Sequence, residues 1–168
     1  MSTVQIERIL NPGRSAAALP LRLSAGVIFT AHGAQKLFGW FGGYGLDGTG
    51  QFMASLGLEP GYLMALLAGS AEFFGGLALL LGLAVRPTGL VLAVTMLVAI
   101  VTAHLLNGLF LSNNGYEFGL ALLGISIALM VQGAGILSVD QLVARRLNSS
   151  FLKSTRHDDR EASHGIAS

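Results

Sequence analysis

The sequence predicts an all-α membrane protein, a bundle of four transmembrane helices whose two termini lie in the cytoplasm. Hydrophobic residues make up 52% of the chain and charged residues only 11%, whereas soluble domains carry about 25% charged residues. The apolar residues gather in four long segments. The basic residues lie outside these segments or near their ends, mostly on one predicted side of the membrane.

Each of the four segments is long enough to cross a bilayer of about 30 Å, and we predict spans at residues 16–38, 62–85, 87–106 and 118–137. The first contains Arg22 and Lys36 near its ends, where long cationic side chains can reach the interface. The second has Glu72 at its centre. The third and fourth contain no Lys, Arg, Asp or Glu, and Pro87 suits the first turn of the third helix.

The distribution of basic residues predicts the orientation. Lys36 is the exception, and the other nine of the ten Lys and Arg residues fall on one side: Arg8, Arg14, Arg22, Arg86, Arg145, Arg146, Lys153, Arg156 and Arg160. Cytoplasmic loops are enriched in Lys and Arg, so both termini are predicted to be cytoplasmic. On this basis Arg22 and Arg86 are interpreted as topology signals.

The segments outside the spans have distinct predicted roles. Residues 1–15 form a cytoplasmic N-terminal segment without a signal peptide. The first outer loop, residues 39–61, places aromatic residues at the interface and contains a short surface helix, residues 49–58. Ser138 and Gln141 form a capping box that opens an amphipathic helix over residues 138–147, and residues 148–168 form a disordered polar tail. The aromatic residues are Trp40, Phe41 and Tyr44, and the apolar face of the surface helix comprises Phe52, Met53 and Leu56.

Composition excludes several classes of chemistry. The chain has no cysteine, so it has no disulfide, no thiol-attached haem and no thiolate metal site. A net charge of +1 gives no footprint for nucleic acid. Imidazole and carboxylate ligands would suit Fe, Zn or Mn, but the chain has no HxxH or ExxH spacing, and we assign no metal ligands.

Titratable residues collect in the predicted outer half of the bundle. A charge at the centre of a span costs about 2.5–3.5 kcal/mol, and such residues usually face a bundle interior or a cavity. Glu72 is therefore expected to pair with His32, Lys36 or His104, with Glu117 at the same outer level as His104.

Stripes of small residues predict which faces point inward, because such stripes let membrane helices approach closely. The stripe of the second span comprises Ala65, Gly69, Glu72 and Gly76, and that of the fourth comprises Glu117, Ala121, Gly124 and Ala128. Both carboxylates are thus predicted to point into the bundle.

This group of side chains admits several interpretations. It can exchange protons with a quinone, hold a metal, or form a proton or solute path. A purely structural interpretation is also open. Glu72 would then be an ion-pair partner that holds helices together, the histidines interfacial residues, and Lys36 an interfacial anchor.

The sequence resembles the DoxX family of bacterial inner-membrane proteins. The resemblance covers about residues 21–140. It is carried by the patterns Arg22…His32-Gly33…Lys36-Leu37-Phe38-Gly39, Gly69…Glu72…Gly75-Gly76…Leu81-Gly82…Arg86, Met96…His104…Gly108-Phe110, Glu117, and Gly133…Gly135…Leu137-Ser138-Val139-Asp140. It implies a four-helix protein of the bacterial inner membrane linked to redox physiology, including quinone chemistry and oxidative stress. It also implies that thiosulfate oxidation would require a second subunit.

These observations lead to one functional hypothesis and two alternatives. The leading hypothesis is a redox-associated subunit that binds a quinone-like molecule, with Glu72 as the proton-exchanging acid and His32 and His104 as headgroup partners. Lys36 and Glu117 would tune charge at the entrance, and Trp40 completes the predicted binding set. One alternative is a membrane scaffold for a soluble redox enzyme, and the other is a small-solute or ion transporter. The expected partners are the lipid bilayer, a soluble redox enzyme or second subunit, and a further copy of the chain.

Overall fold

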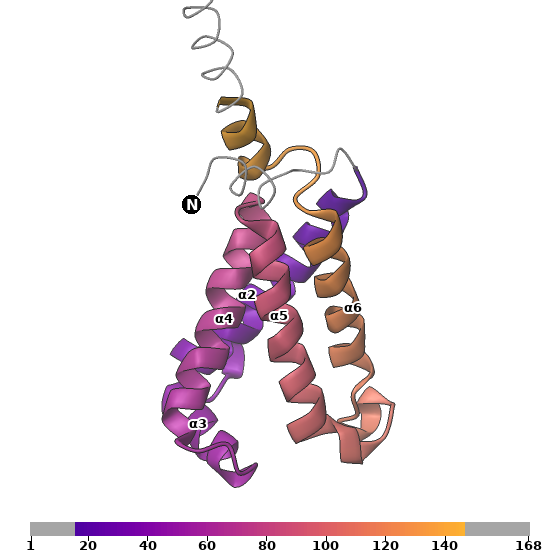
Figure 1. Cartoon of the computed structure of the whole chain (residues 1–168). Coiled ribbons are helices and arrows are strands. Elements are labelled where there is room, and N and C mark those ends of the chain that lie inside the picture. The colour runs from indigo at the N-terminus through magenta and orange to yellow at the C-terminus, as the bar shows by residue number, and fades with distance from the viewer. Residues whose placement is uncertain (1–15, 147–168) are drawn as a thin grey trace, which may run out of the picture.

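The structure is a computed structural model that describes residues 16–146, and this part of the chain is helical without any strand. The predictions for residues 1–15 and for the polar tail at 148–168 lie outside the described residues. Figure 1 shows the helices running side by side as a bundle that is narrow at one end and spread at the other.

Five α-helices form the bundle and its one covering element: α2 (Ala18–Phe38), α3 (Gly45–Ser55), α4 (Gly61–Leu81), α5 (Val85–Ala99) and α6 (Glu117–Gln132). The α5 helix continues through a π-helical turn, η2 (Ile100–His104), into the 3₁₀ turn η3 (Leu105–Asn107). Two further 3₁₀ turns are η1 (Trp40–Gly42) and η4 (Leu111–Asn113). Residues 139–146 form a last helix.

Two tightly packed helix pairs make up the bundle. In the first pair α2 lies against α4, and glycine permits the contact, because a Cβ at Gly33 would collide with the backbone of Phe73. In the second pair α5 lies against α6, where Gly89 faces the backbone of Ser126. Close approach of this kind is typical of packed membrane helices.

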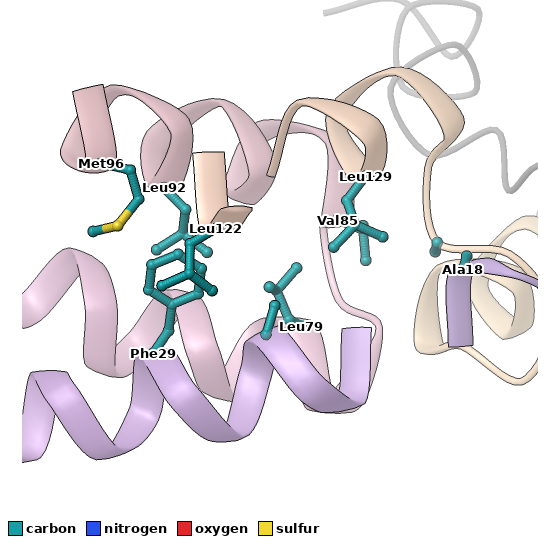
Figure 2. Packing of buried hydrophobic residues seen from close by; sticks show 10 residues of the cluster. Ala18, Phe29, Leu79, Val85, Leu92, Met96, Leu122 and Leu129 are labelled. Carbon is teal, nitrogen blue, oxygen red and sulfur yellow. The ribbon is translucent and has the colours of Figure 1, made fainter. Parts of the chain in front are cut away.

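The apolar core joins the two pairs near the narrow end. Phe29 and Leu79 of the first pair meet Val85, Leu92 and residues of α6 (Figure 2). The exposed fraction of the four named residues is at most 1%. At the other end the pairs spread apart, and this end carries α3, η3 and η4 (Figure 1). We call the two ends the closed end and the open end.

Two of the helices, Gly61–Leu81 and Val85–Asn107, are long and apolar enough to cross a membrane by length and composition. Among the described residues α6 is a shorter apolar helix, with 16 residues. It ends five residues before the predicted limit at Leu137, because Gly133 adopts φ 82° and leaves the helical conformation. In the same way α4 ends at Leu81, where Gly82 caps it with φ 68°.

The closed end is fastened by polar contacts that the sequence did not predict. Arg22 was expected to reach the interface, but the residue is 1% exposed, so that expectation is wrong. Its interpretation as a topology signal stays a prediction. Its guanidinium donates hydrogen bonds to the carbonyl oxygens of Leu79, Ala134 and Leu137. Arg22 therefore joins the end of α4 to the segment that follows α6.

Asp140 completes this arrangement from the last helix. Its carboxylate accepts hydrogen bonds from the backbone N–H groups of Ala84, at 2.7 Å, and Val85, at 3.1 Å. It thus caps the N-terminus of α5 from a distant part of the chain. Ser138 accepts a hydrogen bond from the N–H of Gln141, which is the N-cap contact of the predicted capping box.

The inward face of α6 differs from the predicted one. Ala121 and Gly124 are exposed, and a Cβ added at Gly124 would meet no atom within 4 Å. The buried face consists of Leu122, Ser126 and Leu129. The prediction that the small-residue stripe of this helix points into the bundle is therefore wrong, whereas the stripe of α4 is buried as predicted.

Candidate functional site

A cavity of about 750 Å³ lies between the two helix pairs. It falls within the range of about 300–1,000 Å³ that small-molecule sites occupy. All five α-helices and the η2 and η4 turns contribute to its wall, and most of the lining side chains are aliphatic or aromatic. The cavity extends to the open end, where α3 contributes Phe52 and Met53, the C-cap position of α3 contributes Leu56, and η4 contributes Leu111.

The strongest polar feature of this wall is an ion pair between α2 and α4. Lys36 Nζ lies 2.5 Å from Glu72 Oε2, and both residues line the cavity. The side chain of Glu72 is 4% exposed and that of Lys36 is 24% exposed. Glu72 is therefore the buried member of the pair, and Lys36 is the member that reaches water or a ligand.

Local structure explains why the two side chains meet. Glu72 is the twelfth residue of the 21-residue helix α4 and lies on the stripe that α2 covers. A Cβ at Gly69, one turn earlier, would press on the side chains of Leu37 and Lys36. The absence of a side chain at Gly69 leaves room for Lys36 to cross from α2 to Glu72.

The two histidines line the same cavity from different helices. The ring of His32 packs against that of Phe118, with 5.8 Å between centroids, which connects α2 with α6. His104 ends the π-helical turn, and its Nδ1 lies 2.9 Å from the carbonyl oxygen of Asn114. A carbonyl only accepts, so Nδ1 carries the proton in this contact and Nε2 is left for a ligand.

Two of the predicted site residues lie elsewhere. Glu117 Oε1 accepts a hydrogen bond of 2.6 Å from the N–H of Leu111, and this contact holds the loop before α6. Trp40 is 55% exposed and its ring packs against those of Phe38 and Phe41. Neither residue lines the cavity, so the structure brings together four of the six predicted residues: His32, Lys36, Glu72 and His104.

Sequence reasoning missed several parts of this site. The surface helix was predicted, and its apolar residues were placed against the membrane, but Phe52, Met53 and Leu56 line the cavity. The ring contact of Phe118 with His32 was also missed. The helical spacing of Phe52, Met53 and Leu56 was the only signal for this part of the site. It shows an apolar face but does not show what that face covers.

The described part of the chain contains no group of three or more His, Cys, Asp or Glu side chains that could hold a metal ion. The arrangement is instead an apolar chamber with one buried carboxylate, one ammonium group and two imidazoles. Such a site can hold a flat apolar molecule and place proton donors and acceptors beside its oxygen atoms.

Comparisons with known proteins agree on one relationship. The family model described as DoxX matches residues 17–105. A protein of Bacillus subtilis (strain 168) named "Putative oxidoreductase CatD" is 34% identical over 134 residues, which cover 80% of this chain and 92% of that protein. No solved structure matches the chain.

Proposed function

Because the chain belongs to the DoxX family of membrane proteins, we propose that it is a redox-associated membrane subunit that binds a quinone-like molecule beside Lys36 and Glu72. The name of the Bacillus relative supports the link to oxidation and reduction. The observation that carries the proposal is the placement of this ion pair in the wall of an otherwise apolar cavity.

The chemistry of the cavity suits a quinone headgroup. Reduction of a quinone to its diphenol adds two electrons and two protons, and the ring needs apolar surroundings with proton donors at its two oxygens. Lys36 carries donor hydrogens, and Glu72 sits directly behind it as a proton store. His104 offers Nε2 from the opposite helix pair, since its Nδ1 faces Asn114.

The electrons are supplied by a redox protein that acts as a partner. We expect a soluble enzyme or a second subunit in this role, and the described chain supplies the membrane chamber and the proton-handling groups. This division of labour matches the site, because the four titratable side chains in the apolar wall of the cavity are one acid and three bases: Glu72, His32, Lys36 and His104.

The proposed topology has four spans in the bacterial inner membrane, formed by α2, α4, α5 with its continuation, and α6. The closed end faces the cytoplasm and the open end faces outward. Four of the five Lys and Arg residues in the described part of the chain support this orientation, because they belong to the closed-end side: Arg22, Arg86, Arg145 and Arg146. Lys36 is the exception. The cavity then lies in the outer half of the bundle.

The direct test compares Glu72→Gln with the matched control Glu59→Gln in membranes of a deletion strain complemented with each variant. Glu59 is exposed, and its carboxylate accepts a hydrogen bond from the N–H of Gly61, away from the cavity. We expect Glu72→Gln to reduce quinone-dependent electron transfer by about 100-fold, in line with the loss of a general acid. Glu59→Gln should leave it unchanged.

Immunoblots of washed membranes control for the amount of inserted protein. Full activity of Glu72→Gln at equal protein levels would contradict the proposal. If, in addition, a redox enzyme co-purified equally with the wild type and with Glu72→Gln, the result would favour the scaffold role over a catalytic one.

A further inference from the structure

We infer that the closed end of the bundle binds the headgroup of an anionic phospholipid. The binding residues are Arg86 of α5 and Gln132 of α6, with Arg145 of the last helix beside them, and we call these three residues the headgroup site. None of the three lines the cavity, so the headgroup site is separate from the proposed quinone site and does not depend on it. In the proposed topology it faces the cytoplasmic leaflet.

Charged side chains are divided between the two ends of the bundle. Three carboxylates belong to the open end, those of Asp47 in α3, Glu59 before α4 and Glu117 at the start of α6. The closed end has one carboxylate in the described part of the chain, that of Asp140, and it has four arginines: Arg22, Arg86, Arg145 and Arg146. The closed end is therefore net positive.

The two buried charges of the closed end are already engaged within the fold. Asp140 is 2% exposed, and its carboxylate accepts hydrogen bonds from two backbone N–H groups at the start of α5. Arg22 donates to backbone carbonyls. Neither Arg86 nor Arg145 forms an ion pair with any residue in the described part of the chain. These two guanidinium groups therefore remain available for an anion from outside the chain.

Arg86 and Gln132 also hold two polar atoms that lack an acceptor. The Nε of Arg86 and the Nε2 of Gln132 are enclosed, and neither has a hydrogen-bond partner among residues 16–146. A buried donor without an acceptor is costly. Each residue as a whole is only half-buried, so rotation of its side chain can bring the donor to an acceptor at the surface.

The packing of α5 on α6 places these two residues at the same level. A Cβ at Gly89 would meet the backbone of Met130. Arg86 lies three residues before Gly89, and Gln132 lies two residues after Met130, so both lie toward the closed end from this contact. The unpaired donors therefore come from neighbouring helix ends.

The last helix brings Arg145 to the same end. Asp140 fixes this helix to the backbone of Val85, which directly precedes Arg86. Arg145 is exposed and follows Asp140 by five residues, a rise of about 7 Å along a helix. Arginine side chains are long enough for Arg86 and Arg145 to reach one headgroup layer.

The chemistry of the closed end favours a phospholipid over a soluble acidic partner. Guanidinium groups stay charged and match the oxygens of a phosphate, and basic residues next to membrane helices attract anionic lipids. Three apolar side chains at the same end are also exposed, Leu83 by 44%, Leu137 by 73% and Leu142 by 60%. Acyl chains can cover these side chains while the phosphate binds the arginines.

The experiment titrates the purified full-length protein, in a neutral detergent, with short-chain lipids and counts the bound lipids by native mass spectrometry. The probes are dioctanoyl phosphatidylglycerol, which is anionic, and dioctanoyl phosphatidylcholine, which has the same chains and phosphate but no net charge. Inorganic phosphate is the competitor that represents a free anion. The test variants are Arg86→Gln and Arg145→Gln. The control is Asp47→Asn, which removes an exposed charge at the open end.

We expect the wild type to bind phosphatidylglycerol about tenfold more tightly than phosphatidylcholine. Each arginine variant should weaken phosphatidylglycerol binding by about fivefold and change phosphatidylcholine binding by less than about twofold. Arg86→Lys keeps the charge and loses the planar fork, so its affinity should lie between those of the wild type and Arg86→Gln. Asp47→Asn should have no effect. Because Arg145 is exposed, its variant tests the site even where Arg86→Gln does not fold.

Three results would overturn the headgroup site, and none of them bears on quinone binding. Equal affinity of the wild type for the two lipids would leave the positive closed end to an acidic protein surface. Unchanged phosphatidylglycerol binding in both Arg86→Gln and Arg145→Gln would place the bound lipid elsewhere. Displacement of phosphatidylglycerol by an equal concentration of inorganic phosphate would assign the site to a free anion.

Discussion

At the scale of single residues, Glu72 and Lys36 show how a charged side chain is accommodated inside a membrane helix. A carboxylate in the middle of a membrane helix is tolerated when a partner meets it inside the bundle. Lys36 is that partner, and the pair sits at the boundary between packed helices and an apolar cavity. The same contact therefore joins α2 to α4, and in the proposed function it also presents a proton donor to the quinone.

The contribution of the Lys36–Glu72 ion pair to the stability of the protein can be tested with Lys36→Met. This change leaves the buried carboxylate of Glu72 without its ammonium partner, and we expect it to lower the free energy of unfolding by about 2–3 kcal/mol. Denaturant-induced unfolding of the purified protein in mixed micelles measures this decrease in the free energy of unfolding.

A double-mutant cycle provides the control for this prediction. Glu72→Gln combined with Lys36→Met removes both charges, so the double variant should lose less than the sum of the two single variants. Strictly additive losses would mean that the two side chains contribute independently and that the ion pair does not stabilise the bundle.

At the scale of helices, the contact between α2 and α4 depends on particular glycines. A Cβ at Gly33 would collide with the backbone of Phe73, which has no freedom to move aside. Gly124, on the exposed face of α6, has no neighbouring atom within 4 Å of the place of a Cβ. The two positions therefore form a matched pair for the same substitution.

We expect Gly33→Ala to destabilise the protein by about 1–3 kcal/mol through overpacking. Gly124→Ala should be neutral or stabilising by up to about 1 kcal/mol, because alanine favours a helix over glycine. Thermal unfolding of both variants in the same detergent checks the prediction, and a larger loss at Gly124 than at Gly33 would be inconsistent with the helix packing described above.

The N-terminus of α5 depends on Asp140, which lies more than fifty residues later in the chain. Asp140→Ala removes the acceptor for two backbone N–H groups and should cost about 1–2 kcal/mol. Hydrogen exchange should accelerate at Ala84 and Val85 more than in the middle of α5. Uniform acceleration along the helix would indicate a global effect and not the loss of a cap.

Much of the helical layout follows from the sequence, because long apolar runs without charges predict helices regardless of their neighbours. The predicted positions of the helix ends were less accurate, because α4 and α6 end at Gly82 and Gly133, inside apolar runs. The prediction of which face of α6 points into the bundle was also wrong. Its small residues and the set Leu122, Ser126 and Leu129 recur with the same helical spacing, and the sequence alone does not decide between two stripes.

The candidate site was predictable in part for similar reasons. Glu72 was expected to be buried, because exposure of a carboxylate to lipid is costly. The sequence left three candidate partners for Glu72, because the choice depends on how α2 is rotated against α4. Arg22 was misinterpreted because its acceptors are carbonyls at the ends of α4 and of the loop after α6, which meet only in the folded chain.

At the scale of the whole molecule, two helix pairs lie close together at the closed end and spread apart toward the open end (Figure 1). A cavity lies between the two pairs. The proposed function needs the open end to face outward. The chain has no cysteine, so each introduced cysteine is a unique reporter of the side on which it lies.

We expect Ser112→Cys, in the loop before α6, to react with a membrane-impermeant maleimide in intact spheroplasts. Ala144→Cys, in the last helix, should react only after the membrane is permeabilised. The reverse pattern would place the cavity in the cytoplasmic half and reject the proposed orientation.

The most direct test of the central claim is the position of a bound quinone headgroup relative to Glu72 and Lys36. An azido-benzoquinone photolabel applied to the purified wild-type protein, followed by peptide mass spectrometry, gives this position, with excess unlabelled quinone as the competitor. We expect competable labelling of the cavity-lining parts of α2, α4 and α5, reduced in Lys36→Met and retained in Glu59→Gln. Labelling that is confined to lipid-facing residues outside the cavity, or that the competitor does not reduce, would contradict the central claim.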